Sequence, residues 1–149
     1  MNKLVRMCLP LLVFCFSSSL WADITEVDNA KLQELIKQGV PVIDVRRLDE
    51  WEKTGVIEGA HTLTFFDKQG RYDAHKWLTA LDQIAPKGQP VILICERGVR
   101  SKNIADLLDK RLGYAGVHNH TAGMSNWIGK GHPVIEYSAL SDDKEPTDK

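Results

Sequence analysis

Short apolar runs alternate with segments of helical periodicity along most of this chain. Val40–Val45 and Val91–Ile94 consist almost entirely of apolar residues. That composition is typical of strands covered on both faces of a sheet. Thr62–Phe66 and Val117–His120 are weaker strand candidates. Because Val91–Ile94 is the most apolar run, we expect it at the centre of the sheet.

Apolar residues at three- and four-residue spacing predict amphipathic helices between these strands. The first lies between its N-cap Asp28 and Gly39, the second covers Asp73–Ile84, and the third covers Ser101–Leu112. A short last helix is expected over Met124–Ile128. The side chains expected on buried faces are Leu32, Leu35 and Ile36 of the first helix, Trp77, Leu78, Leu81 and Ile84 of the second, and Ile104, Ala105, Leu107, Leu108 and Leu112 of the third. Strands alternating with helices predict an α/β fold with a mainly parallel sheet between helical layers, and ligands at the carboxyl ends of the strands.

The two ends of the chain differ from this pattern. Residues 1–22 combine an early basic stretch, a short apolar core and small residues up to Ala22, which predicts a secretory signal peptide cleaved after Ala22. The apolar core is too short to span a bilayer. A lipoprotein signal at Cys15 is disfavoured, because Phe14 stands where a small residue is needed. We therefore expect one domain over 23–137, a periplasmic protein without a membrane anchor, and a flexible polar tail over 138–149.

Net charge points to no particular partner. The chain carries −1 at pH 7, so nothing in the balance indicates nucleic-acid binding. The chain has three cysteines, and two of them, Cys8 and Cys15, fall in the predicted signal. Cys95 is then a single thiol in an exported domain, which directs attention to reactivity, metal binding or intermolecular pairing.

Cys95 ends the most apolar strand and begins the sequence C-E-R-G-V-R-S, which leads into a predicted helix. Backbone N–H groups at such a strand-to-helix turn can converge on the sulfur, and the helix dipole adds partial positive charge. Arg97 and Arg100 add full charges, and Gly98 permits a turn that a side chain would hinder. Each of these features favours a thiolate over a thiol. The residues therefore predict a nucleophilic thiol in an anion-binding loop.

The same residues resemble the rhodanese sulfurtransferases, in particular small exported single-domain members. Cys95–Ser101 is similar to the family form C-x-x-G-x-R-S. D-V-R-R-L-D-E-W at Asp44–Trp51 with G-V-I-E-G-A at Gly55–Ala60, and A-G-M-S-N-W at Ala122–Trp127 with the following G-H-P-V, resemble further family elements. Val56 and Glu58 depart from the usual His and Pro, and Ala122 replaces a first glycine. The resemblance implies a three-layer rhodanese-like domain with about five strands.

The resemblance also implies a function. Cys95 would take the outer sulfur of thiosulfate or a similar small donor, hold it as a persulfide and pass it to a thiophilic acceptor, with no cofactor or metal. The backbone of Glu96, Arg97, Gly98, Val99, Arg100 and Ser101 would form the anion-binding loop, and Arg97 and Arg100 would attract the donor. Glu96 is unusual, because its carboxylate opposes an anion unless it points to solvent or pairs with an arginine. We expect a monomer, and an exposed thiol that oxidants could convert to sulfenic acid or a Cys95-linked dimer.

Two alternatives remain. Cysteine-dependent phosphatases and arsenate reductases also hold an oxyanion in a cysteine loop, but theirs place five residues between cysteine and arginine. Only four separate Cys95 from Arg100. The other alternative is a rhodanese module with a redox role, or a non-catalytic one that binds partners or sulfide; non-catalytic modules often lack the cysteine that this chain retains.

Other prominent residues have structural interpretations. His118 and His120 would share one face of a strand, but no third zinc ligand is evident. Asp44, Arg46 and Glu50 are expected to form an ion-pair group beneath the rim of the site, because buried charges occur in pairs. Trp51, Trp77 and Trp127 are expected to pack in the core.

Overall fold

The computed structural model describes residues 24–138, which form one parallel sheet between two helical layers. The strands are β1 (Thr25–Val27), β2 (Val42–Asp44), β3 (His61–Thr62), β4 (Val91–Ile94) and β5 (Val117–His120). Their order across the sheet is β1-β5-β4-β2-β3, and every neighbouring pair is parallel. The predicted α/β class, the five strands and the central place of β4 are confirmed.

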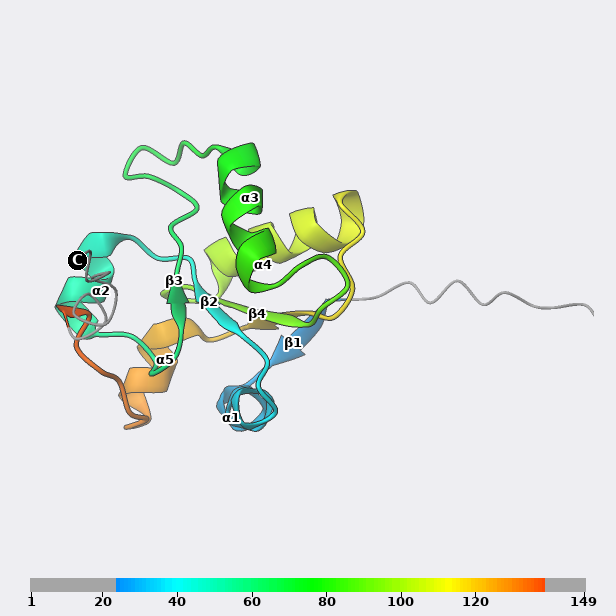
Figure 1. The fold of residues 1–149 in the computed structure, drawn as a ribbon. Coiled ribbons are helices and arrows are strands. Elements are labelled where there is room, and N and C mark those ends of the chain that lie inside the picture. Colours follow the sequence, from blue (N-terminus) through cyan, green and yellow to red (C-terminus); the bar gives the residue numbers. More distant parts are fainter. Residues whose placement is uncertain (1–23, 139–149) are drawn as a thin grey trace, which may run out of the picture.

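The helices cover both faces of the sheet. They are α1 (Asn29–Lys37), α2 (Leu48–Thr54), α3 (Ala74–Ile84), α4 (Val99–Asp106) and α5 (Gly123–Gly129). A π-helical turn, η1 (Leu107–Arg111), continues α4. In Figure 1, α3 and α4 lie on one side of the sheet and α1 and α5 on the other, which is the expected three-layer arrangement.

The central strand shows how one sequence supplies two cores. All four residues of β4 are fully buried. Val91 and Leu93 pack with side chains of α3 and α4, whereas Ile92 and Ile94 pack with side chains of α1 and α5. This alternation follows from the two-residue period of a strand, and it explains why the run is apolar throughout. Trp77 and Trp127 belong to these two cores, and Trp51 is buried as well, as expected.

The sequence prediction missed two elements. β1 has only three residues, of which Val27 alone is buried, so its apolar signal is small. It pairs with β5 and is the fifth strand of the sheet. α2 has seven residues with one buried side chain, Trp51, so it also lacks a clear period. Its acidic first turn, Asp49 and Glu50, is the signal that could have located it, since acids favour helix N-termini.

Several predicted boundaries differ from the structure. The strand expected over Val40–Val45 is shorter and covers Val42–Asp44. The strand expected over Thr62–Phe66 ends at Thr62. Leu63 N still bonds to Asp44 O, but Phe65 then turns into the core and packs edge-on against Trp77. The helix expected from Ser101 begins at Val99, because Gly98 adopts a left-handed conformation and serves as its N-cap.

Both terminal predictions fall outside the part of the chain that the structure describes. The signal expected over 1–22 lies wholly beyond it, and Ser138 is the one described residue of the expected tail. Within residues 24–138, no helix has the length and apolar character that crossing a bilayer requires.

Candidate active site

Cys95 directly follows the central strand, at the carboxyl edge of the sheet. β2 ends beside it, since Asp44 pairs with Ile94 and Val45 N bonds to Ile94 O at 2.9 Å. The sheet therefore places the loop after β4 next to the loop after β2, where Arg46 lies. This is the edge at which parallel α/β folds bind ligands.

Helix α5 holds the cysteine loop from one side. The N–H of Met124 donates to Cys95 O at 2.8 Å, and the N–H of Ser125 donates to Glu96 O at 3.0 Å. The described chain contains no cis peptide, and in a trans peptide the N–H points opposite to the C=O of the same unit. The N–H groups of Glu96 and Arg97 therefore point away from α5, toward the open side of the loop.

Two glycines permit this close approach. Gly98 has φ +83°, and a Cβ at this position would lie 1.9 Å from Thr121 O. Gly123, with φ +65°, would place a Cβ 2.4 Å from Glu96 O. At both positions a side chain is disfavoured by the positive φ and would also clash with a neighbouring backbone atom. The loop and the start of α5 are thus packed backbone to backbone.

Helix α4 begins immediately after Gly98, so its unpaired N–H groups lie in the same loop. Val99, Arg100 and Ser101 form its first turn, and the N–H groups of a first turn have no acceptor within the helix. Ser101 Oγ is buried, 3.4 Å from Cys95 Sγ and 3.1 Å from Gly98 O. Its one hydroxyl proton can donate to either atom. The predicted loop residues are therefore brought together around the sulfur.

The expectation of an exposed thiol is wrong. Cys95 is free, but only 1% of it is exposed, because it continues β4 into the core beside α3 and α4. An open pocket of about 350 Å³ leads to it, lined by Glu50, Cys95, Glu96, Arg97, Val99 and Arg100. A small donor can enter such a pocket. The buried cysteine of a second folded domain cannot approach as easily, because the loop residues of the two domains come into contact first.

The two arginines of the loop differ in their partners. Arg97 is exposed, and its guanidinium makes no ion pair with any residue in 24–138. Arg100 forms a bidentate pair with Glu50 of α2, at 2.8 and 2.5 Å. This hydrogen bonding raises the pKa of Arg100 above its ordinary value, with smaller contributions from Cys95 and Glu96. Burial raises the pKa of Glu50, but hydrogen bonds from Arg100 and from the Arg47 backbone outweigh burial and lower it overall.

Beneath the pocket lies a buried ion pair. Arg46 is 0% exposed and donates to both oxygens of Asp44, to Thr54 Oγ1 and to Gly55 O. The structural role expected for Asp44 and Arg46 is confirmed. The expectation that Glu50 belongs to the same ion-pair group is wrong, because its carboxylate pairs with Arg100 and Arg47.

Glu96 pairs with an arginine, which was one of the two arrangements expected for it. One carboxylate oxygen accepts from Ser125 Oγ at 2.5 Å, and the other lies 3.6 Å from Nη1 of Arg46. About a third of its side chain, 35%, remains exposed. The carboxylate is thereby held at the pocket, between α5 and the loop after β2.

The histidines of β5 have other roles. His120 is fully buried, and its Nε2 lies 2.7 Å from Asn29 Oδ1. Burial lowers the pKa of His120 to about 4, and that of His118 is lowered by burial as well. Among the described residues, no group of three or more His, Cys, Asp or Glu side chains is arranged to hold a metal ion.

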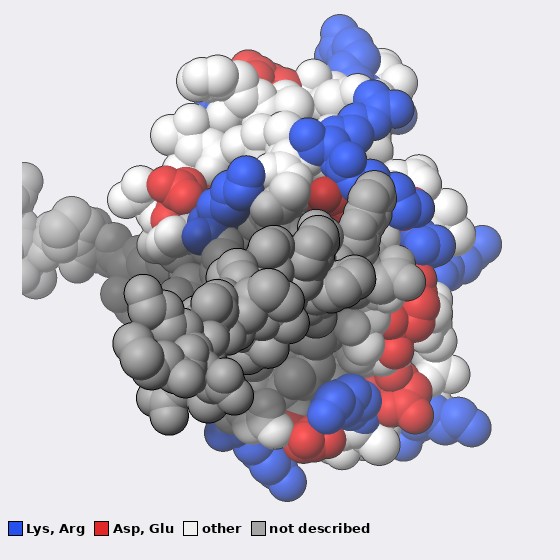
Figure 2. Space-filling view, turned by 90° about the vertical axis from the view of Figure 1, so that its right-hand side faces the viewer, with Lys and Arg blue, Asp and Glu red and all other residues white. Residues whose placement is uncertain are grey.

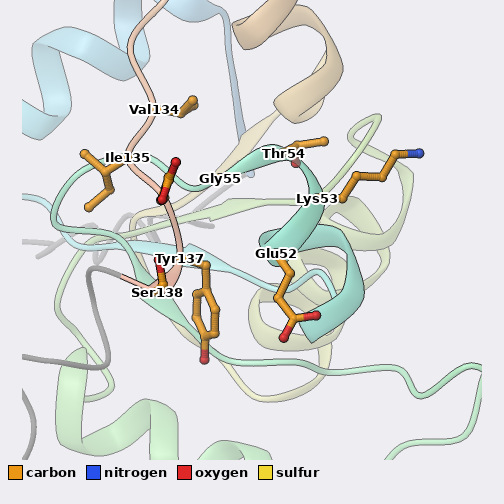
Figure 3. A pocket seen from close by; sticks show the side chains of 9 residues that line it. Glu52, Lys53, Thr54, Gly55, Val134, Ile135, Tyr137 and Ser138 are labelled. Atoms are coloured by element: carbon orange, nitrogen blue, oxygen red, sulfur yellow. The ribbon is translucent and has the colours of Figure 1, made fainter.

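A second pocket lies away from the cysteine. It has a volume of about 460 Å³ between the end of α2 and the segment 134–138. In Figure 3 the side chains of Tyr137 and Glu52 point in the same direction, away from Val134 and Gly55. None of the predicted site residues lines this pocket, so we place the chemistry at Cys95. Figure 2 shows basic and acidic side chains on the same face of the molecule, without a field of one sign across it.

Comparison with known proteins assigns the family. Residues 28–130 match the rhodanese-like domain. Rhodanese-like domain-containing protein 17 of Arabidopsis thaliana is 26% identical over 123 residues, which cover 79% of this chain and 78% of that protein. The chain belongs to the rhodanese-like domain family.

Solved structures share the fold. A rhodanese-related protein of Thermoplasma volcanium has 25% identity and a TM-score of 0.57, covering 74% of this chain and 97% of that one. The polysulfide-sulfur transferase of Wolinella succinogenes, described as a homodimer, has 20% identity and a TM-score of 0.60, covering 79% and 82%. A Rhodopseudomonas palustris protein described as a possible tyrosine phosphatase has 23% identity and a TM-score of 0.56, covering 75% and 85%.

Proposed function

We propose that this protein is a sulfurtransferase, which moves a sulfane sulfur from thiosulfate or a similar donor to a thiophilic acceptor. The observation that carries the proposal is the position of Cys95 at the carboxyl edge of the sheet, next to the first turn of α4. Ser101 Oγ of that turn lies 3.4 Å from its sulfur. Unpaired N–H groups and a helix N-terminus stabilise negative charge on sulfur.

The reaction has two steps. The Cys95 thiolate attacks the outer sulfur of thiosulfate; the new S–S bond forms as the bond to the sulfonate sulfur breaks, and sulfite leaves with the electron pair. An acceptor such as cyanide or a thiolate then attacks the terminal sulfur of the persulfide, and the Cys95 thiolate is restored. The N–H groups of residues 96–101 would hold the anionic sulfur through both steps.

The geometry argues against phosphoester hydrolysis. A cysteine-dependent phosphatase uses the loop arginine to clamp the phosphate, but Arg100 directs its two terminal nitrogens to Glu50. With only four residues between Cys95 and Arg100, the loop also encloses less space than one with five.

Steady-state assay tests the proposal. We expect thiosulfate-dependent thiocyanate formation from cyanide, and its complete loss in Cys95→Ser and Cys95→Ala. Turnover that persists in either variant, or hydrolysis of an aryl phosphate without any sulfur transfer, would overturn the assignment.

We further propose that the protein acts in the periplasm as a monomer after cleavage at Ala22. This rests on the pattern of residues 1–22. Expression of the full chain should yield a periplasmic product beginning at Asp23; a cytoplasmic product that retains residue 1 would contradict it. The molar mass of that product from analytical ultracentrifugation tests whether it is a monomer.

A further inference from the structure

The pocket in front of Cys95 carries balanced charge rather than excess positive charge. Its lining contains two carboxylates, Glu50 and Glu96, and two guanidinium groups, Arg97 and Arg100. Once Cys95 is ionised, the lining has a net negative charge. A cationic excess among the side chains would favour a dianion over a monoanion, and this lining does not supply one.

The two acidic residues are not equivalent. Glu50 is neutralised by two arginines, because Arg100 pairs with it bidentately and Arg47 lies 3.4 Å from it. Glu96 is held by an uncharged hydroxyl, Ser125 Oγ, and lies at 3.6 Å from Arg46. Arg46 is itself paired at 2.8 Å with Asp44. The cluster of Asp44, Arg46 and Glu96 therefore retains one negative charge, and Glu96 is its member that lines the pocket.

The pocket also has an apolar wall. Val99 is 68% exposed, although it lies in the first turn of α4 and lines the pocket beside Cys95. The side chain of an exposed valine offers an inorganic oxyanion no polar group. It can contact an alkyl group, and contact between apolar surfaces in water is favourable.

We infer that Glu96 and Val99 select, as the sulfur donor, a singly charged organic sulfane compound rather than a dianion. The donor carries one negative charge on its terminal sulfur and an apolar substituent on the other side of the S–S bond. Glu96 disfavours a second negative charge, and Val99 contacts the substituent. This inference rests on the proposed function, because it concerns the donor for the same cysteine.

Methanethiosulfonate and thiosulfate are a matched pair of probes, since a methyl group in the first replaces a charged oxygen in the second. With methanethiosulfonate, Cys95 thiolate attacks the terminal sulfur, the new S–S bond forms, the old S–S bond breaks, and methanesulfinate leaves with the electron pair. No oxidant, reductant or proton is consumed. Both donors leave the same persulfide on Cys95, so differences between them report on the pocket.

The experiment measures kcat/KM for both donors with cyanide as acceptor. We expect the wild type to prefer methanethiosulfonate. Glu96→Gln should raise kcat/KM for thiosulfate about three- to tenfold more than for methanethiosulfonate, as expected for one charge removed at about 7 Å in a partly aqueous site. Glu96→Asp keeps the charge and should preserve the wild-type ratio. Glu136→Gln removes an exposed carboxylate outside the pocket and should leave kcat/KM for both donors unchanged.

Val99→Ser tests the apolar wall independently. It should lower kcat/KM for methanethiosulfonate a few-fold more than kcat/KM for thiosulfate, as expected when a small apolar contact is lost. If both donors load Cys95 but neither Glu96→Gln nor Val99→Ser changes their ratio beyond twofold, the inference is overturned and the sulfurtransferase stands. If neither donor loads sulfur onto Cys95 in any of these proteins, the proposed function fails and the inference with it.

Discussion

Gly98→Ala is the substitution that most sharply tests the packing of the cysteine loop. Two costs add at this position. The φ of +83° is a left-handed conformation, which costs an L-residue about 1 to 2 kcal/mol. The new Cβ would also lie 1.9 Å from Thr121 O, so the loop and the end of β5 must separate by more than an ångström.

The separation strains the sheet. Thr121 N donates to Val27 O at 3.2 Å, so moving the Thr121 backbone disturbs the β1–β5 edge. Overpacking of this kind costs about 1 to 3 kcal/mol. We therefore expect Gly98→Ala to lower the free energy of unfolding by about 2 to 5 kcal/mol in total, and to reduce sulfur transfer because the N–H groups of the loop move with it.

Gly70→Ala is the matched control. Gly70 has φ +76° in an exposed turn, and a Cβ there meets nothing within 4 Å. This variant should lose only the conformational part of the unfolding free energy, about 1 to 2 kcal/mol, and keep its activity. Urea unfolding followed by Trp fluorescence measures the unfolding free energy of both variants. Equal losses in the two variants, within about 0.5 kcal/mol, would refute the close approach of Gly98 and Thr121.

Two further predictions concern buried charge. Arg46→Met leaves Asp44 buried without its partner and should cost about 3 to 5 kcal/mol of unfolding free energy; in urea unfolding, a loss below about 1 kcal/mol would contradict the pairing. His120 has a folded pKa of about 4 against an ordinary 6.5. The unfolded chain therefore takes up its proton first as pH falls, so this contribution to stability is complete above about pH 6.5 and is lost toward pH 4. Between pH 7.5 and 5 the wild type should lose about 2 kcal/mol more than His120→Gln, in which a neutral side chain replaces the imidazole; equal losses in the two proteins would exclude His120 as the cause.

The sequence predicted the central part of the fold because that part has strong periodicity. The run Val91–Ile94 is apolar at every position, since both faces of β4 are covered. The edge strand β1 and the short helix α2 each bury a single side chain, so neither produces a recognisable pattern. Their structure is determined by pairing with β5 and by packing of Trp51, which are long-range contacts invisible to local periodicity.

The candidate site could be located from the sequence, but the hydrogen-bond and ion-pair partners of its side chains could not. C-E-R-G-V-R-S after an apolar strand pointed to Cys95 and to a turn at Gly98, but not to Gly98 as the N-cap of α4. The sequence did not show that Arg100 turns to Glu50, fifty residues away, or that Ser125 holds Glu96. These bonds depend on α2 and α5 meeting the loop in space. The burial of Cys95 escaped prediction for the same reason, because its core cluster includes side chains of α3, which is distant in the sequence.

Intact mass of the purified protein, before and after thiosulfate, tests the central claim most directly. We expect a gain of about 32 Da, one sulfur atom, that cyanide removes and that Cys95→Ser never shows, as a covalent persulfide on this cysteine requires. A wild-type mass that stays unchanged with thiosulfate and with methanethiosulfonate, or a gain that persists in Cys95→Ser, would contradict the account.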